Sequence, residues 1–159
     1  MDQVVLNCVM HSAIRIRPAG KADLPAILGL YRCLAPEDPN LDANKAQEIW
    51  SQMLNSGAVI PLVAVADCEP VASCILVIVP NLTRGGRAFA VIENVITHPR
   101  FRRRGIGTAM LHDAVKRAWA ANCYKVVLTT RRRSEELYAF YEKAGFQRAT
   151  RTAFDIRSP

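Results

Sequence analysis

The sequence predicts an α/β protein with one mixed, mostly antiparallel central sheet of about six to seven strands and about four flanking helices. β-rich runs and runs with helical spacing occur in the same chain, without an internal repeat. Two β-rich runs, 58–66 and 71–79, are joined by a hairpin-like turn at 67–70, which indicates antiparallel pairing. A strand, a long helix and another strand follow between residues 88 and 130, and this order implies a parallel pair.

The first half of the chain supplies a short strand and two helices ahead of the hairpin. Residues 14–18 alternate like a strand and end in proline. A helix is predicted over 22–34, with Asp23 as its cap and a proline in its first turn. A second helix is predicted over 42–55, because apolar residues recur at helical spacing and Gly57 can end it.

The second half begins with a polar, glycine-rich connection. A strand, a long helix with an apolar stripe that includes Trp119, a strand, a last helix and a closing strand are expected after it. They are predicted at residues 88–97, 104–122, 124–130, 134–144 and 146–156. We interpret residues 14–159 as a single domain and residues 1–13 as an N-terminal extension.

Composition indicates a globular protein. Hydrophobic residues make up 50% of the 159 residues and charged residues 22%, unlike a disordered chain. The longest apolar runs are too short to cross a bilayer, and Asp2 stands where a signal peptide carries positive charge. The five scattered cysteines form no C-x-x-C pair. We therefore expect a cytoplasmic protein with reduced thiols, no membrane partner and no metal.

A basic turn between the strand at 88–97 and the long helix is the main functional feature. Four of the five residues at 100–104 are Arg, and Gly105 and Gly107 follow at the expected helix start. Amides at a helix start lack partners within the helix, and the dipole favours negative charge there, so the turn suits phosphate. Met110 stands where a dinucleotide fingerprint needs its third glycine, and no Gly-Lys-Ser/Thr triplet occurs. A dinucleotide fold and a P-loop are therefore disfavoured.

The stretch 102–107, Arg-Arg-Arg-Gly-Ile-Gly, fits the pattern Arg/Gln-x-x-Gly-x-Gly/Ala. It resembles the acetyl-CoA-binding motif of the GCN5-related N-acetyltransferase (GNAT) family, with a second match at 140–146. The resemblance covers nearly the whole chain and implies the GNAT fold. It also implies an acyltransferase that passes an acetyl group from acetyl-CoA directly to a primary amine, with a small-molecule acceptor favoured over a protein. Dimers are frequent in that family, so a homodimer is an open expectation.

The resemblance assigns cofactor contacts to three segments. Backbone groups of Val95, Ile96 and Thr97 would pair with the pantetheine arm, and one N–H there would polarise the thioester carbonyl. The diphosphate would be held by the turn and the helix start, at Arg102, Arg103, Arg104, Gly105, Ile106, Gly107 and Thr108. On the last helix, contacts would come from Tyr138 and from Ser134, which stands where the family commonly has Asn. Ser134 also suits a helix cap.

Two residues are candidates for proton transfer. If strand alternation holds, Glu93 shares a face with Val91 and Val95, and a carboxylate among apolar side chains suits a general base. The alternative is an ion pair with a nearby Arg, and the bulge typical of the resembled family would redirect Glu93. The resemblance implies that Tyr141, ahead of the Gly-Phe pair, is the general acid, with Tyr138 as fallback. Alternatively, both Tyr side chains only pack the helix against the sheet.

Two other functions stay open. The net charge of +7 and the Arg clusters at 100–104 and 131–133 suit an anionic partner, which is either a polyanionic cofactor or a nucleic acid. Aromatic residues are not interleaved with these clusters and no nucleic-acid-binding motif is present, so we expect no nucleic-acid partner. A non-catalytic acyl-CoA sensor of the same fold would bind cofactor without turnover. No readable motif identifies the acceptor amine.

Overall fold

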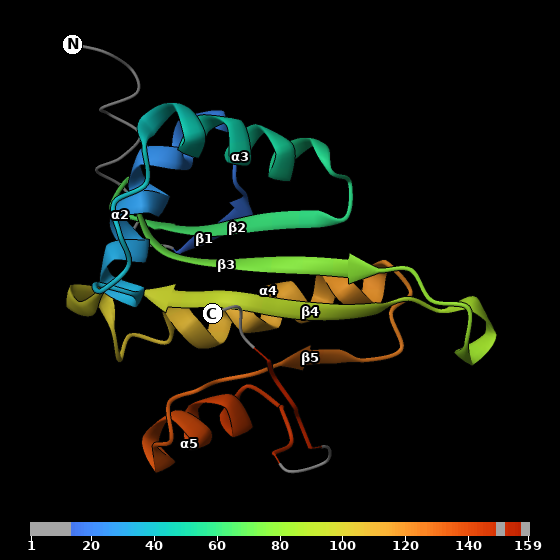
Figure 1. Cartoon of the computed structure of the whole chain (residues 1–159). Coiled ribbons are helices and arrows are strands. Elements are labelled where there is room, and N and C mark those ends of the chain that lie inside the picture. Colours follow the sequence, from blue (N-terminus) through green and yellow to red (C-terminus); the bar gives the residue numbers. More distant parts are fainter. Residues whose placement is uncertain (1–13, 149–151, 157–159) are drawn as a thin grey trace.

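The computed structural model describes residues 14–148 and 152–156. The strands are β1 (Arg15–Pro18), β2 (Val59–Ala66), β3 (Glu69–Val79), β4 (Phe89–Thr97) and β5 (Val126–Leu128). They form one sheet in the order β1-β2-β3-β4-β5 (Figure 1). Neighbours are antiparallel except β4 and β5, which are parallel. The predicted mixed, mostly antiparallel sheet is confirmed, although the described residues contain five strands and not the six to seven expected.

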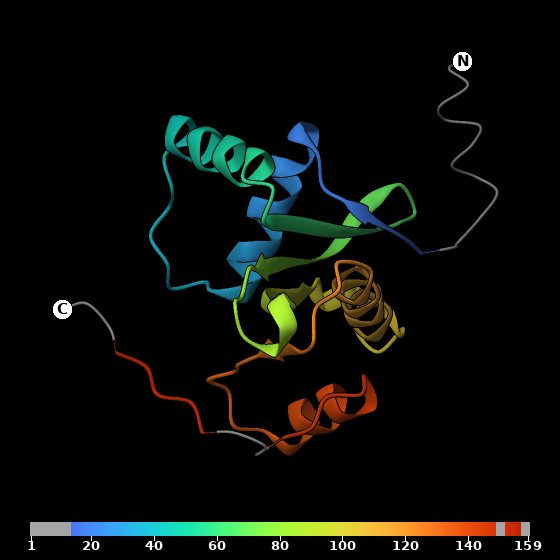
Figure 2. The same ribbon diagram turned by 90° about the vertical axis from the view of Figure 1, so that its right-hand side faces the viewer.

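Helices cover both faces of this sheet (Figure 2). The helices α2 (Leu24–Leu34) and α3 (Ala43–Asn55) lie on one face, and α4 (Ile106–Ala120) lies on the other. The last helix, α5 (Glu135–Lys143), lies beyond β5 (Figure 1). Short 3-10 turns precede α2 (η1, Lys21–Asp23), β4 (η2, Arg84–Gly86) and α4 (η3, Pro99–Phe101). The four predicted helices are confirmed.

Aspartates stand at the starts of α2 and α3 but have different roles. Asp42 is the cap of α3, because its Oδ1 accepts from the N–H groups of Asn44 and Lys45 at 3.0 and 3.1 Å. Asp23 does not cap α2 through its side chain, contrary to the prediction. Its carboxylate instead accepts two bonds from the Arg17 guanidinium, at 2.7 and 2.9 Å. Asp23 thereby joins β1 to the start of α2.

Two apolar clusters hold the layers together, one on each face of the sheet. Leu76 and Ile92 pack with Met110 and Leu111 of α4, and all four side chains are buried. On the opposite face, Val63 packs with buried residues of α2 and α3. Because successive strand residues point to opposite faces, the sheet is apolar on both sides and buried between helices.

β4 contains a bulge near its end. Ile75 of β3 pairs with Glu93, whereas Ser73 pairs with Ile96, so β4 has one extra residue between these pairs. Asn94 has φ +51°, a left-handed conformation that Asn tolerates better than most residues. Ile92 belongs to the α4-side cluster and Val95 packs against it. Since alternation puts Glu93 on the other face from Ile92, the prediction that Glu93 and Val95 share a face is wrong.

The end of β4 has no strand beside it on its outer edge in the described residues. β5 pairs only with residues Ala90, Val91 and Ile92, whereas β3 follows β4 as far as Thr97. Beyond Ile92, β4 and β5 therefore separate, and the edge of residues 93–97 faces the space between α4 and α5.

The predicted closing strand at 146–156 is absent from its described residues, which are irregular. Phe154 and Ile156 are 93% and 99% exposed, so burial of these side chains does not contribute the hydrophobic stabilisation that a strand packed on the sheet would gain. Trp119 was expected in the apolar stripe of α4, yet it is 52% exposed. The predicted N-terminal extension, 1–13, lies outside the described residues.

The cysteines differ in state. Cys33, Cys74 and Cys123 are free, and burial raises the pKa of the Cys74 thiol to about 12. Cys68 is disulfide-bonded, so the expectation of reduced thiols is wrong at this position, which no spacing motif had indicated. Within the described segments, every helix is too short or too polar to pass through a lipid bilayer.

Candidate active site

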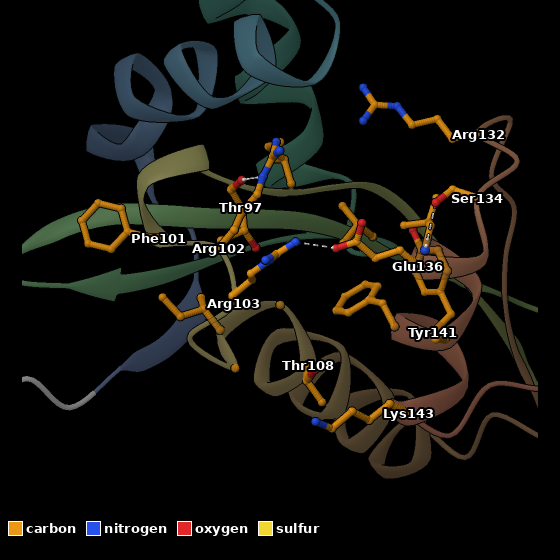
Figure 3. A pocket seen from close by; sticks show the side chains of 18 of the residues that line it. Thr97, Phe101, Arg102, Arg103, Thr108, Arg132, Ser134, Glu136, Tyr141 and Lys143 are labelled. Atoms are coloured by element: carbon orange, nitrogen blue, oxygen red, sulfur yellow. Dashed lines mark hydrogen bonds and ion pairs between the residues drawn. The ribbon is translucent and has the colours of Figure 1, made fainter.

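A cavity of about 840 Å³ lies where β4, α4 and α5 diverge (Figure 3). Most residues predicted to contact a ligand line it together. They are Val95, Ile96 and Thr97 at the end of β4, Arg102, Arg103, Gly105, Ile106, Gly107 and Thr108 at the turn and helix start, and Ser134 and Tyr141 around α5. The volume is within the usual range for small-molecule sites, so one elongated ligand fits here.

The start of α4 presents backbone donors to this cavity. Gly105 precedes the helix with φ +77°, a conformation that favours glycine. The Ala109 N–H donates to the Gly105 carbonyl at 2.9 Å. The amides of Ile106, Gly107 and Thr108 come before this bond, in the turn whose N–H groups have no partner within a helix. They lie at the positive end of the helix dipole, which favours an anion.

The three consecutive arginines of the turn, Arg102 to Arg104, have different partners. Arg102 folds back, and its Nε donates to the Thr97 carbonyl at 3.2 Å. Arg103, with φ +61°, reaches across the cavity to the Glu136 carboxylate (Figure 3). Both residues line the cavity. Arg104 does not line it, and its guanidinium lies 5.0 Å from the centre of the Phe101 ring.

Gly107 allows α4 and α5 to approach closely. A Cβ at this position would stand 3.1 Å from two ring atoms of Phe140 and 3.3 Å from Thr97 Oγ1. These distances are tighter than ordinary contacts between heavy atoms, so a larger residue would push α5 or β4 outward. The second glycine of the motif is therefore explained by packing, in addition to access to the backbone.

Tyr141 is partly buried at the α5 side of the cavity. Its ring packs beside Phe140 and edge-on to Phe146, with centroid distances of 5.0 and 6.4 Å. Burial raises the pKa of Tyr141, the Glu93 carboxylate raises it further, and Arg132 lowers it. The hydroxyl therefore stays protonated at neutral pH, as a proton donor requires.

Besides Arg104, two predicted residues, Glu93 and Tyr138, lie outside the cavity lining. Glu93 is exposed at the bulge, so the expected apolar surroundings of its carboxylate are absent. It still acts electrostatically on Tyr141. Tyr138 does not line the cavity, and Arg148 lies 4.9 Å from the centre of its ring. Ser134 both lines the cavity and caps α5, accepting from the Leu137 N–H at 3.4 Å.

The sequence prediction missed several lining residues. They are Cys33 and Leu34 at the end of α2, Phe101 at the end of η3, and Glu136, Leu137, Ala139, Phe140 and Lys143 on α5. Arg132 also lines the cavity and belongs to the Arg cluster at 131–133 that was predicted to suit an anionic partner. Leu137 could have been found, because it lies one helical turn before Tyr141 and shares its face. No local signal connects α2 to this cavity, since the contact arises only when the layers pack.

The cavity suits a ligand with phosphate at one end and an extended amide-bearing arm. The helix start and the guanidinium of Arg103 are placed for phosphate. The edge of β4 that β5 leaves uncovered offers backbone groups to an extended chain, as sheet edges do for bound strands. These two features meet at Thr97, whose Oγ1 would stand 3.3 Å from a Cβ on Gly107, and Tyr141 lines the same cavity.

Comparison of the sequence with known proteins identifies acetyltransferases as its relatives. The model of the acetyltransferase (GNAT) family matches residues 26–146. Glucosamine 6-phosphate N-acetyltransferase of Trypanosoma brucei brucei is 43% identical over 77 residues, which are 48% of this chain and 50% of that protein. The chain thus matches only about half the length of this relative. Glucosamine 6-phosphate N-acetyltransferase 1 of rice, Oryza sativa subsp. japonica, is 30% identical over 84% of this chain and 81% of its own length.

A solved structure resembles the whole described fold. It is of a protein from Agrobacterium tumefaciens whose name calls it an acetyltransferase. The two chains are 43% identical, and the match covers 91% of this chain and 99% of the other with a TM-score of 0.87.

Proposed function

Because this chain belongs to the acetyltransferase (GNAT) family, we propose that it transfers the acetyl group of acetyl-CoA to the primary amine of a small molecule. One observation carries the proposal: the start of α4, the uncovered edge of β4 and the hydroxyl group of Tyr141 all border the same cavity. The first two fit a diphosphate and an amide-bearing arm. The third fits the end of such an arm, where a thioester lies.

The cofactor assignment uses residues of this chain at both ends of the cavity. The amides of Ile106, Gly107 and Thr108 and the Arg103 side chain bind the diphosphate. Arg102 is held by its bond to the Thr97 carbonyl, which fixes the turn beside the strand edge. Backbone groups of residues 95–97 pair with the arm, and an N–H of this edge stabilises negative charge on the carbonyl oxygen.

Bound acetyl-CoA supplies a thioester that an unprotonated amine attacks, so that the new N–C bond forms as the C–S bond breaks. Tyr141 donates its proton to the departing sulfur, because the hydroxyl remains protonated at neutral pH and borders the cavity. Glu93 is the candidate acceptor of the amine proton. Since Glu93 is exposed and outside the lining, it acts through water at the bulge.

The acceptor proposed first is glucosamine 6-phosphate. Both curated relatives described above carry this substrate in their names, and the rice protein matches most of this chain. Arg132 and Lys143 add positive charge to the cavity wall, which suits an amine that also carries a phosphate. The chain as a whole is also positively charged, with a net charge of +7, which favours the approach of an anionic acceptor.

The test is an assay of thiol release from acetyl-CoA over a panel of amines that includes glucosamine 6-phosphate, unphosphorylated glucosamine and lysine peptides. We expect turnover on the phosphorylated sugar and much less on the other two. Tyr141→Phe serves as the low-turnover control.

Each failure of this test has its own meaning. Coenzyme A binding without turnover on any amine would replace the enzyme by a sensor of acyl-CoA. Calorimetry that detects no binding of coenzyme A would overturn the whole proposal.

A further inference from the structure

An ion pair crosses the proposed cofactor cavity. Nη2 of Arg103, in the turn before α4, lies 3.2 Å from Oε1 of Glu136, in the first turn of α5 (Figure 3). Both side chains are exposed, at 86% and 80%, and both line the cavity. Exposed pairs of this kind are weak, because water solvates each partner well after separation.

The position of Glu136 is unexpected for a site that binds a polyanion. Among the described residues that line the cavity, Glu136 is the acidic one, and Arg102, Arg103, Arg132 and Lys143 are cationic. An acidic residue in the first turn of α5 also complements the helix dipole. The neighbouring Glu135 is also in the first turn of α5, so it complements the dipole as well. Glu135 pairs with Arg148 and lies outside the cavity lining. The helix therefore has no need for a carboxylate on the cavity side.

Of the two arginines of the turn that line the cavity, Arg102 and Arg103, Arg103 is the one that can change partners. Arg102 is committed to the Thr97 carbonyl, and Arg104 to the Phe101 ring. Arg103 is held by a weak, exposed pair, and its forked donors bind phosphate oxygens at least as well as a carboxylate.

From this arrangement we infer that Glu136 competes with the cofactor diphosphate for Arg103, and thereby limits how tightly and how long coenzyme A is held. When Arg103 binds phosphate, it leaves the Glu136 carboxylate without its partner and close to a second anion. Both effects disfavour the complex relative to a protein without this carboxylate. Fast release of the product coenzyme A is the functional gain, since release often limits turnover. The inference rests on the cofactor assignment of the proposed function.

The experiment is calorimetric titration of coenzyme A into the full chain and its variants, with release measured by stopped-flow. Glu136→Gln is expected to tighten binding about three- to tenfold at low ionic strength, and to slow release by a similar factor. High salt should shrink the difference, because both side chains are exposed. Glu135→Gln is the matched control, one residue away with the same charge change, and should alter affinity less than about twofold.

A double-mutant cycle separates competition for Arg103 from simple repulsion. Arg103→Gln should weaken binding, and in that background Glu136→Gln should bring no gain. A full gain in the Arg103→Gln background, or unchanged or weaker binding by Glu136→Gln alone, would overturn the inference. Wild-type protein that binds no coenzyme A would instead remove the proposed function. Circular dichroism of each variant checks that the fold is kept.

Discussion

The α carbon of Gly107 in α4 faces the ring of Phe140 in α5, so closely that a Cβ on Gly107 would stand 3.1 Å from two ring atoms. Phe140 is the immediate neighbour of Tyr141, and the two rings lie 5.0 Å apart. The spacing of α4 and α5 therefore also determines where the proposed proton donor stands.

We expect Gly107→Ala to lower kcat/KM by roughly ten- to a hundredfold, because a displacement of α5 misplaces Tyr141 relative to the reacting atoms. The free energy of unfolding should change by less than about 1 kcal/mol, since the better helix propensity of Ala offsets the strain at the contact. Steady-state kinetics and urea unfolding measure the two quantities.

Gly29→Ala is the matched control for this substitution. Gly29 lies within α2, and nothing stands within 4 Å of a Cβ built on it. It should stabilise the protein by about 0.5–1 kcal/mol and leave kcat/KM unchanged. Equal kinetic losses in both variants would show that the Gly107 contact has no special role.

Tyr141→Phe is expected to lower kcat by about a hundredfold or more while the affinity for coenzyme A stays within about twofold, because only the proton donor is removed. Tyr138→Phe should leave both quantities unchanged, since its ring packs with Arg148 outside the cavity. Rapid-quench turnover and calorimetry provide the measurements. Normal turnover in Tyr141→Phe would contradict the assignment of the acid.

The ionisation of Tyr141 should respond in opposite directions to its two charged neighbours. Glu93 raises the pKa of Tyr141 and Arg132 lowers it, so Glu93→Gln should lower this pKa and Arg132→Gln should raise it. Because the acid works while protonated, the alkaline loss of kcat should move to lower pH in Glu93→Gln and to higher pH in Arg132→Gln.

Phenolate absorbance measures this ionisation directly. Each protein is titrated with base and compared with its own Tyr141→Phe counterpart, so that the signal of Tyr141 is isolated by difference. Shifts of the same sign in both variants would contradict the electrostatic arrangement.

Asp23→Asn should lower the free energy of unfolding by about 2 kcal/mol, because a carboxylate of 9% exposure loses a two-pronged bond with Arg17. The Arg17 hydrogen bond lowers the pKa of Asp23. The stabilisation is therefore present above the unfolded-state pKa and is lost as pH falls through the folded-state value. Denaturant unfolding at several acidic pH values should show this loss in the wild type and a weaker one in Asp23→Asn.

Glu48→Gln is the control for the Asp23 experiment. Glu48 pairs with Lys45, and both side chains are 56% exposed. Its removal should cost less than about 0.5 kcal/mol. A comparable loss in both variants would mean that burial of Asp23 does not matter.

Features with a local cause could be predicted from the sequence. Asp42 and Ser134 cap helices because a short polar side chain bonds to amides two or three residues ahead. The glycines at 105 and 107 mark a helix start that needs a left-handed residue and a close approach. The fold class and the phosphate-binding turn follow from such local signals together with the order of elements, whereas the strand end and the α5 side of the cavity were predicted from the resemblance to the GNAT family.

The remaining features depend on how distant segments pair. The Asn94 bulge is a mismatch between β3 and β4, and it puts Val95 on the face opposite Glu93, where unbroken strand alternation predicts the same face. Residues at the end of α2 meet the cavity only after the two layers close over the sheet. The contact between Glu136 and Arg103 spans 33 positions of sequence, so no local pattern indicates it.

The short β5 has a consequence for handling the protein. Residues 93–97 of β4 form a strand edge that β5 does not cover. Another chain can pair with such an edge and aggregate, and natural proteins usually cover or block exposed edges. In the proposed complex, the amide-bearing arm of coenzyme A pairs with this edge and covers it. Preparations supplied with coenzyme A should therefore stay monodisperse during concentration and heating, whereas ligand-free preparations precipitate at lower temperature.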